Sequence, residues 1–155
     1  MFKHLLVPTD GSALSEAAVN MTVKLAVESG AKVTGLHVIP EFRVLAYGTE
    51  MIADNEERVI QVARQRADDY LAVITQAAAQ AGVECATVAM NRAHPYEAII
   101  SVAEQRHCDL IVMASHGRSG MRAFLLGSET QKVLTHSQIP VLVVRQPTKT
   151  GHGAT

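Results

Sequence analysis

The sequence predicts an α/β domain built on a parallel sheet, because short runs rich in β-branched residues alternate with longer segments of helical spacing. The chain has 155 residues, of which 48% are hydrophobic, and this suits a single domain with a substantial core. We expect the domain to occupy residues 1–146 and residues 147–155 to form a flexible tail.

The first elements follow from turn residues and apolar spacing. A strand is predicted at His4–Pro8, and the turn Thr9–Ser12 that follows it can end by capping a helix. Apolar residues spaced from Leu14 to Leu25 predict that helix, and Gly30 suits its C-terminal end. A second strand is predicted at Val33–Ile39.

The middle of the chain begins with a connection that lacks any clear period. This stretch, Glu41–Ala53, is long for a loop and is therefore a candidate lid or interface segment. Asp54 followed by Glu57 resembles a capping box, which predicts the start of a long helix that ends at Gly82. A third strand is predicted at Val83–Met90.

The last third predicts two helices and two strands. His94-Pro95 indicates a helix start, since proline is favoured at the first helical position. The nearly all-apolar run Leu110–Ala114 is typical of a central strand covered on both faces. The glycine-containing loop Ser115–Gly127 leads to a short helix at Ser128–His136, and Pro140–Arg145 is the last predicted strand.

Composition excludes several classes of protein. Fourteen basic and 15 acidic residues give a net charge of −1. Proteins that bind nucleic acid need a basic surface, and this near-neutral charge argues against one. The apolar runs are too short to cross a membrane, and the two cysteines form no C-x-x-C pair. Seven histidines show no metal-ligand spacing, and no signal-peptide pattern is visible. We therefore expect a cytoplasmic protein without a structural metal.

The loop after the fourth strand has features of a phosphate site. Gly117 and Gly120 allow backbone N–H groups to approach an anion closely. Ser128 opens a helix whose first N–H groups lack partners within the helix, and Arg118 and Arg122 add positive charge. A purely structural interpretation stays open on these residues alone, in which the glycines only shape a turn and Ser128 with Gln131 forms a capping box.

Six segments, spread in order over almost the whole chain, carry a recognisable pattern: Leu5–Ser12, Leu36–Val38, Asp109–Met113, Ser115–Arg118, Leu125–Ser128 and Pro140–Val144. Together they resemble the universal stress protein family. The resemblance implies a Rossmann-like, five-stranded sheet ordered 3-2-1-4-5 with helices on both faces. It also implies a homodimer through the last strand, Pro140–Arg145, and, in one branch of the family, bound ATP or AMP.

That nucleotide-binding branch is marked by G-x2-G-x9-G-[ST]. Gly117, Gly127 and Ser128 stand at the matching positions, whereas Ala114 replaces the first glycine. The alanine adds one methyl group beside the expected ribose, and this is acceptable unless the backbone there needs a positive φ. The resemblance therefore favours nucleotide binding.

The resemblance assigns a role to each matching position. Pro8, Thr9 and Asp10 would flank the adenosine, with Asp10 near the ribose or a phosphate-bound magnesium ion. The main chain of Val38 would pair with the adenine edge, the end of the fourth strand would pack by the ribose, and the loop after it would hold phosphate. The candidate nucleotide-binding residues are Pro8, Thr9, Asp10, Val38, Met113, Ala114, His116, Gly117, Arg118, Gly127, Ser128 and Glu129.

Two of these side chains have alternative interpretations. His116 either donates a hydrogen bond to phosphate or faces solvent. The Glu129 carboxylate either points inward, where it opposes an additional phosphate, or faces water and favours the N-terminus of its own helix. The choice between AMP and ATP stays open for this reason.

The leading functional expectation is a regulatory module of the stress response that binds an adenine nucleotide and changes a surface seen by an unidentified protein partner. One alternative is a slow ATP-hydrolysing enzyme, and another is a structural dimer whose nucleotide site is vestigial because of Ala114. No catalytic residue is predicted, because the adjacency of Ser115 and His116 in the sequence does not place their side chains in catalytic contact and no nucleophile elbow is present.

Overall fold

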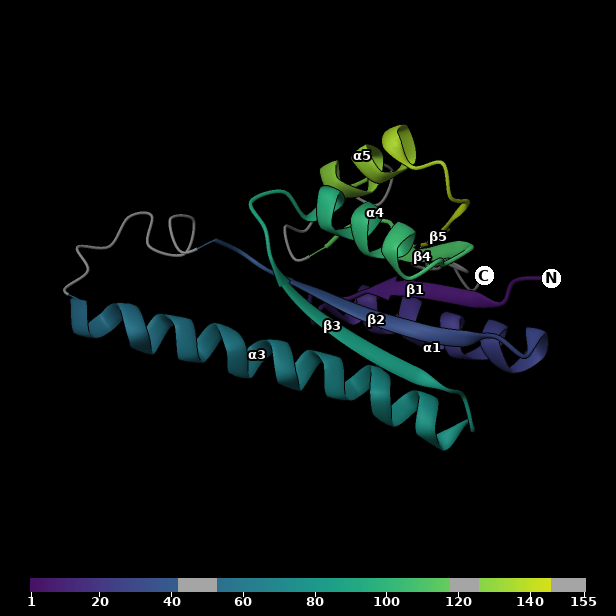
Figure 1. Cartoon of the computed structure of the whole chain (residues 1–155), viewed down its shortest axis with the longest axis horizontal. Coiled ribbons are helices and arrows are strands. Elements are labelled where there is room, and N and C mark those ends of the chain that lie inside the picture. The colour runs from purple at the N-terminus through teal and green to yellow at the C-terminus, as the bar shows by residue number, and fades with distance from the viewer. Residues whose placement is uncertain (42–52, 118–125, 146–155) are drawn as a thin grey trace, which may run out of the picture.

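The computed structural model describes residues 1–41, 53–117 and 126–145, and its strands form one parallel five-stranded sheet (Figure 1). The strand order β3-β2-β1-β4-β5 confirms the order that the family resemblance implies. The strands are β1 (His4–Pro8), β2 (Lys32–Ile39), β3 (Cys85–Asn91), β4 (Leu110–Ala114) and β5 (Val141–Val144).

Helices cover both faces of this sheet. Figure 1 shows one pair, α1 and α3, on one side of the strands and the other pair, α4 and α5, on the opposite side. The helices are α1 (Ala13–Ser29), α3 (Ala53–Gln80), α4 (Pro95–Gln105) and α5 (Ser128–His136). Most element bounds lie within about two residues of the sequence predictions, which is the ordinary uncertainty of helix and strand ends.

The central strand β1 contributes to two hydrophobic cores. Leu5 and Val7 pack in the core under α1 and α3, whereas Leu6 packs in the core under α4 and α5. All three side chains are fully buried, and each contributes about 1.5–3 kcal/mol of burial free energy. The alternation explains why this strand is apolar throughout, since a parallel strand with helices on both faces has no solvent side.

A capping contact marks the start of α1, and a proline marks the start of α4. Ser12 is the N-cap of α1, and its hydroxyl oxygen accepts a hydrogen bond from the backbone N–H of Ser15 at 3.2 Å. Gly30 ends the helix, as the sequence predicts. The helix α4 begins with Pro95, directly after His94, and this prediction is also confirmed.

The start of α3 differs from the sequence prediction. The helix already includes Ala53, so Asp54 lies inside it, whereas a capping residue must lie outside the helical conformation. The predicted capping box at Asp54 and Glu57 is therefore wrong. The candidate lid falls, except for its two end residues, outside the described part of the chain, and the expected tail lies outside it entirely.

Two further observations concern membrane spans and the two cysteines. Among the described residues, no helix has the length and apolar character that a membrane span requires. Cys85 and Cys108 are both free thiols. Burial raises the pKa of Cys108 to about 11, with the neighbouring Asp109 carboxylate acting in the same direction, so this thiol is protonated and unreactive at neutral pH.

Candidate functional site

A cavity of about 250 Å³ lies at the carboxyl ends of β1, β2 and β4. Parallel α/β sheets bind ligands at this edge, at the point where the strand order changes direction. The residues that line the cavity are Pro8, Thr9, Asp10, Ser15, Val38, Pro95, Ile99, Met113, Ala114, His116, Gly117, Gly127, Ser128, Glu129 and Thr130. The structure thus brings together every predicted site residue except Arg118, which lies outside the described residues, as Arg122 does.

The loop after β1 is held by its own side chains. The Asp10 Oδ1 atom accepts a hydrogen bond from the Ser12 N–H at 3.0 Å. The Thr9 hydroxyl accepts from the Gly11 N–H at 3.1 Å and lies 3.1 Å from the Ser15 hydroxyl. Such side-chain to backbone bonds fix a turn locally, so Asp10 enters the cavity from a well-defined backbone.

A buried histidine connects this loop to the next strand. The His37 Nδ1 atom lies 2.7 Å from the Thr9 carbonyl oxygen, and because a carbonyl only accepts, Nδ1 carries the proton and donates. The His37 ring also meets the Tyr70 ring edge-on, with 5.1 Å between ring centroids. His37 therefore joins the loop after β1, the strand β2 and the helix α3.

The two glycines of the loop after β4 allow close approach between chain segments. A Cβ atom at Gly117 would collide with the Asp10 carboxylate, which belongs to the loop after β1. A Cβ atom at Gly127 would lie 3.1 Å from the Cα of His116, and the Gly127 N–H donates to the Ser115 carbonyl at 2.7 Å. A side chain at Gly117 would require the Asp10 carboxylate to move, and one at Gly127 would require the loop after β4 to shift by a few tenths of an ångström.

The N-terminus of α5 opens at the cavity without a side-chain cap among the described residues. Its N-cap is Gly127, and Ser128 is already the first helical residue. The capping box of Ser128 and Gln131, which the purely structural interpretation proposed, is therefore wrong, and the Gln131 amide instead donates to the Leu126 carbonyl at 2.7 Å. The first N–H groups of a helix are a ready site for an anion when no cap satisfies them.

The alanine that replaces the first motif glycine is compatible with the site. Ala114 is the last residue of β4, and it is not among the described non-glycine residues with a positive φ. The backbone at this position therefore does not require glycine. The Ala114 carbonyl accepts a hydrogen bond from the Thr130 hydroxyl at 2.9 Å, which ties the end of β4 to the first turn of α5.

Four lining residues were not among the predicted site residues: Ser15, Pro95, Ile99 and Thr130. Pro95 and Ile99 come from α4, which follows β3, whereas the predicted site residues lie at or after the ends of β1, β2 and β4. Ser15 and Thr130 lie in the first turns of α1 and α5, one turn beyond the predicted loops. Their helical positions were predicted, but nothing in the local pattern showed that they face a common cavity.

The comparison with known proteins decides the family. The sequence matches the universal stress protein family over residues 1–145. The chain belongs to this family. The universal stress protein YxiE of Bacillus subtilis is 34% identical over 149 residues, which cover 94% of this chain and 100% of the relative.

Solved structures support the same assignment. The structure of MJ0577, a universal stress protein of Methanocaldococcus jannaschii, has a TM-score of 0.80 and 28% identity, covering 95% of this chain and 98% of that one. A universal stress protein solved in complex with cAMP has a TM-score of 0.60 and 25% identity, covering 93% of this chain and 97% of that one.

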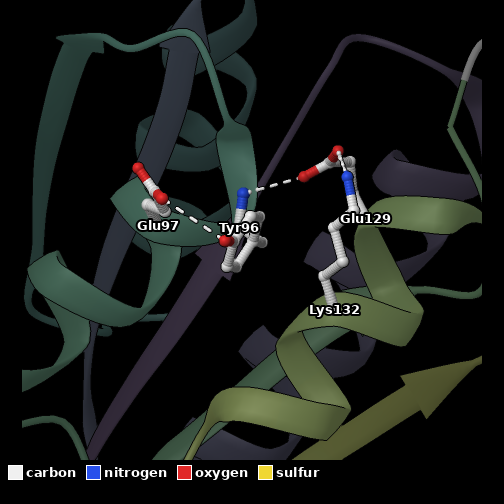
Figure 2. A network of polar contacts seen from close by, with 4 residues as sticks. All are labelled: Tyr96, Glu97, Glu129 and Lys132. Atoms are coloured by element: carbon white, nitrogen blue, oxygen red, sulfur yellow. Dashed lines mark hydrogen bonds and ion pairs between the residues drawn. The ribbon is translucent and has the colours of Figure 1, made fainter.

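In this universal stress protein the Glu129 side chain follows neither of the two orientations considered from the sequence. Its Oε2 atom accepts a hydrogen bond from the backbone N–H of Tyr96 at 2.9 Å, and Lys132 Nζ lies 3.5 Å from its Oε1 atom (Figure 2). The carboxylate is therefore directed at the first turn of α4. Local sequence gives no signal for this contact, since the two residues lie 33 positions apart.

Ser115 and His116, a pair of residue types found in catalytic sites, follow directly after β4. The Ser115 hydroxyl lies 3.3 Å from the His116 Nδ1 atom, so the two side chains are in contact. Ser115 is only 4% exposed, however, and it does not line the cavity. The pair consequently does not present a nucleophile to a ligand. Within the described residues, no group of three potential ligand side chains is placed to hold a metal ion.

Proposed function

We propose that this universal stress protein binds an adenine nucleotide, AMP or ATP, with a phosphate at the N-terminus of α5. The observation that carries the proposal is the helix N-terminus itself, which opens at the cavity with glycine at its N-cap and no side-chain cap among the described residues. A phosphate there gains hydrogen bonds from main-chain N–H groups and a favourable interaction with the helix dipole. The cAMP complex of a related universal stress protein supports this class of ligand.

The remaining walls suit the nucleoside part. The cavity has an apolar side that combines strand ends with one helix, formed by Pro8, Val38, Pro95, Ile99 and Met113. Such a surface favours a flat base and a ribose over a free inorganic anion. The main chain of Val38, at the end of β2, would pair with the adenine edge, and Asp10 would lie near the ribose or a phosphate-bound magnesium ion.

The proposed role is regulatory rather than catalytic. A nucleotide in this cavity would contact the loop after β1, the end of β2 and the N-terminus of α5 at once. It can change a surface seen by a protein partner only to the extent that it binds one conformation more tightly than another. We also propose a homodimer through β5, because this strand is an edge of the sheet and its Leu142 side chain is 38% exposed.

The direct experiment is to identify a nucleotide that accompanies the purified protein. The chain has no tryptophan and three tyrosines, so bound adenine would visibly change its ultraviolet spectrum, and mass spectrometry of the acid-released ligand would name it. Protein freed of ligand should be stabilised by AMP or ATP. At 100 times the dissociation constant, binding adds about 2.7 kcal/mol to the free energy of unfolding. No released nucleotide and no change of Tm at millimolar AMP and ATP would contradict the proposal.

A further inference from the structure

One residue of the proposed phosphate site also contacts the opposite wall of the cavity. Glu129 is the second residue of α5, and it lines the cavity next to Ser128. Its side chain reaches away from α5 and accepts a hydrogen bond from the Tyr96 N–H in the first turn of α4, with 2.9 Å between the two atoms (Figure 2). A single residue thus belongs to the cavity wall of one helix and holds the N-terminus of another.

The contact supplies a hydrogen-bond acceptor for a backbone N–H in the first turn of α4. Pro95 occupies the first helical position and has no N–H, and His94 at the N-cap makes no side-chain capping bond. The Tyr96 N–H is therefore the first donor of this helix, and it has no acceptor within the helix. The Glu129 carboxylate supplies that acceptor, and its negative charge is favourable at a helix N-terminus.

Side chains farther along α5 support the same contact. Lys132 Nζ lies 3.5 Å from the Glu129 Oε1 atom and 5.5 Å from the centroid of the Tyr96 ring. The Tyr96 ring stacks on the His136 ring, with 5.4 Å between centroids and 28° between planes. Three residues of α5 therefore hold Tyr96, and its backbone and its ring are both restrained.

The two helix N-termini held in this way are two walls of the cavity. Pro95 and Ile99 of α4 line one side, and the segment from Gly127 to Thr130, which opens α5, lines another. We propose that Glu129 is a positioning residue of the nucleotide site: its carboxylate fixes α4 against α5 and so sets the separation between the base-side wall and the phosphate site. The inference rests on the proposed nucleotide function.

A competing view assigns Glu129 an electrostatic role, in which its charge repels the nucleotide phosphate. The two roles are separated by a pair of conservative variants. Glu129→Gln keeps the length of the side chain and an acceptor oxygen but loses the charge. Glu129→Asp keeps the charge but is one methylene shorter, so it no longer reaches the Tyr96 N–H. Asp remains favourable in the first turn of α5, which protects the fold of this variant.

Calorimetric titration with AMP gives the first readout. Positioning predicts that Glu129→Asp weakens AMP binding by about tenfold, whereas Glu129→Gln stays within about threefold of the wild type. The matched control is Glu97→Asp, because the Glu97 carboxylate accepts from the Tyr96 hydroxyl at 3.3 Å, is exposed and does not line the cavity. This control should bind AMP like the wild type.

Hydrogen exchange of the Tyr96 amide, measured without nucleotide, gives the second readout. The amide should be protected in the wild type, in Glu129→Gln and in Glu97→Asp, and it should lose protection in Glu129→Asp. Unchanged AMP affinity in Glu129→Asp, tighter binding in Glu129→Gln, or an equal loss in Glu97→Asp would overturn the positioning role. A wild type that protects Tyr96 but binds neither AMP nor ATP would instead overturn the proposed function on which it rests.

Discussion

Replacing Ser128 by proline removes one main-chain donor from the proposed phosphate site, together with the serine hydroxyl. Ser128 is the first helical residue of α5, and proline is favoured at this position because its N–H would have no partner in the helix. The preceding residue, Gly127, has φ −59° and ψ 154°, which is the extended conformation that a following proline prefers. The backbone around the substitution is therefore already suited to proline, and we expect the fold to be retained.

The expected loss of affinity follows from the one bond removed. A hydrogen bond from an N–H to a charged phosphate contributes about 1.5–3 kcal/mol, which corresponds to a loss of about 10- to 150-fold in affinity. The control is Ser128→Ala, which lacks the hydroxyl but keeps the N–H. Because both variants lack the hydroxyl, the difference between them reports the replacement of the amide N–H by the proline ring.

Calorimetric titration of the two variants with AMP, together with thermal unfolding without ligand, measures both effects. Ser128→Pro should unfold at the wild-type temperature or slightly above it, since proline restricts the unfolded chain. Its AMP affinity should nevertheless be at least about tenfold below that of Ser128→Ala. Equal affinities in the two variants would refute phosphate binding by the main chain of α5.

Three further predictions concern stability and assembly. Gly127→Ala should lower the free energy of unfolding by about 1 kcal/mol, because the added Cβ would lie 3.1 Å from the His116 Cα and alanine is a poor N-cap. Thermal unfolding measures this loss, and an unchanged Tm would contradict it. Burial lowers the pKa of His4 below 6.5, and the positive charge of Lys32 acts in the same direction, so the unfolded chain binds more protons than the folded one. The contribution of His4 to stability should be fully present above pH 6.5 and decrease as the pH falls below it. Urea unfolding at pH 7.5 and 5.0 measures this effect, and the free energy of unfolding should decrease less between the two pH values for His4→Gln than for the wild type. Equal decreases in the two proteins would contradict this role of His4. If β5 pairs two copies, Leu142→Arg should shift the sedimentation coefficient from that of a dimer to that of a monomer, whereas a monomeric wild type would dismiss the dimer.

The fold was accessible from the sequence because its signals are local. The apolar run at Leu110–Ala114, the turn that ends in Ser12 and the proline at 95 each describe the conformation of neighbouring residues, and each appears in the structure as predicted. Capping was the weaker signal, because a serine or aspartate near a helix start does not by itself show which residue the helix begins with. Both Asp54 and Ser128 resemble caps, yet both lie inside their helices.

The candidate site was predictable where it depends on sequence motifs and not where it depends on contacts between distant elements. The motif residues Gly117, Gly127 and Ser128 stand together at the cavity, as the family resemblance implied. The contribution of Pro95 and Ile99 could not be read from their own segment, because it depends on how α4 packs over the sheet relative to β4 and α5.

The sequence by itself determined the parallel α/β architecture, the strand and helix segments and, through its motifs, the family. Hydrophobic periodicity and turn residues suffice for this, because they act over a few neighbouring positions. Only the tertiary structure decided where the Glu129 carboxylate points and that Gly117 lies against the Asp10 carboxylate. The physical reason is that hydrogen bonds and close approaches between segments far apart in the chain depend on packing geometry, which no local pattern encodes.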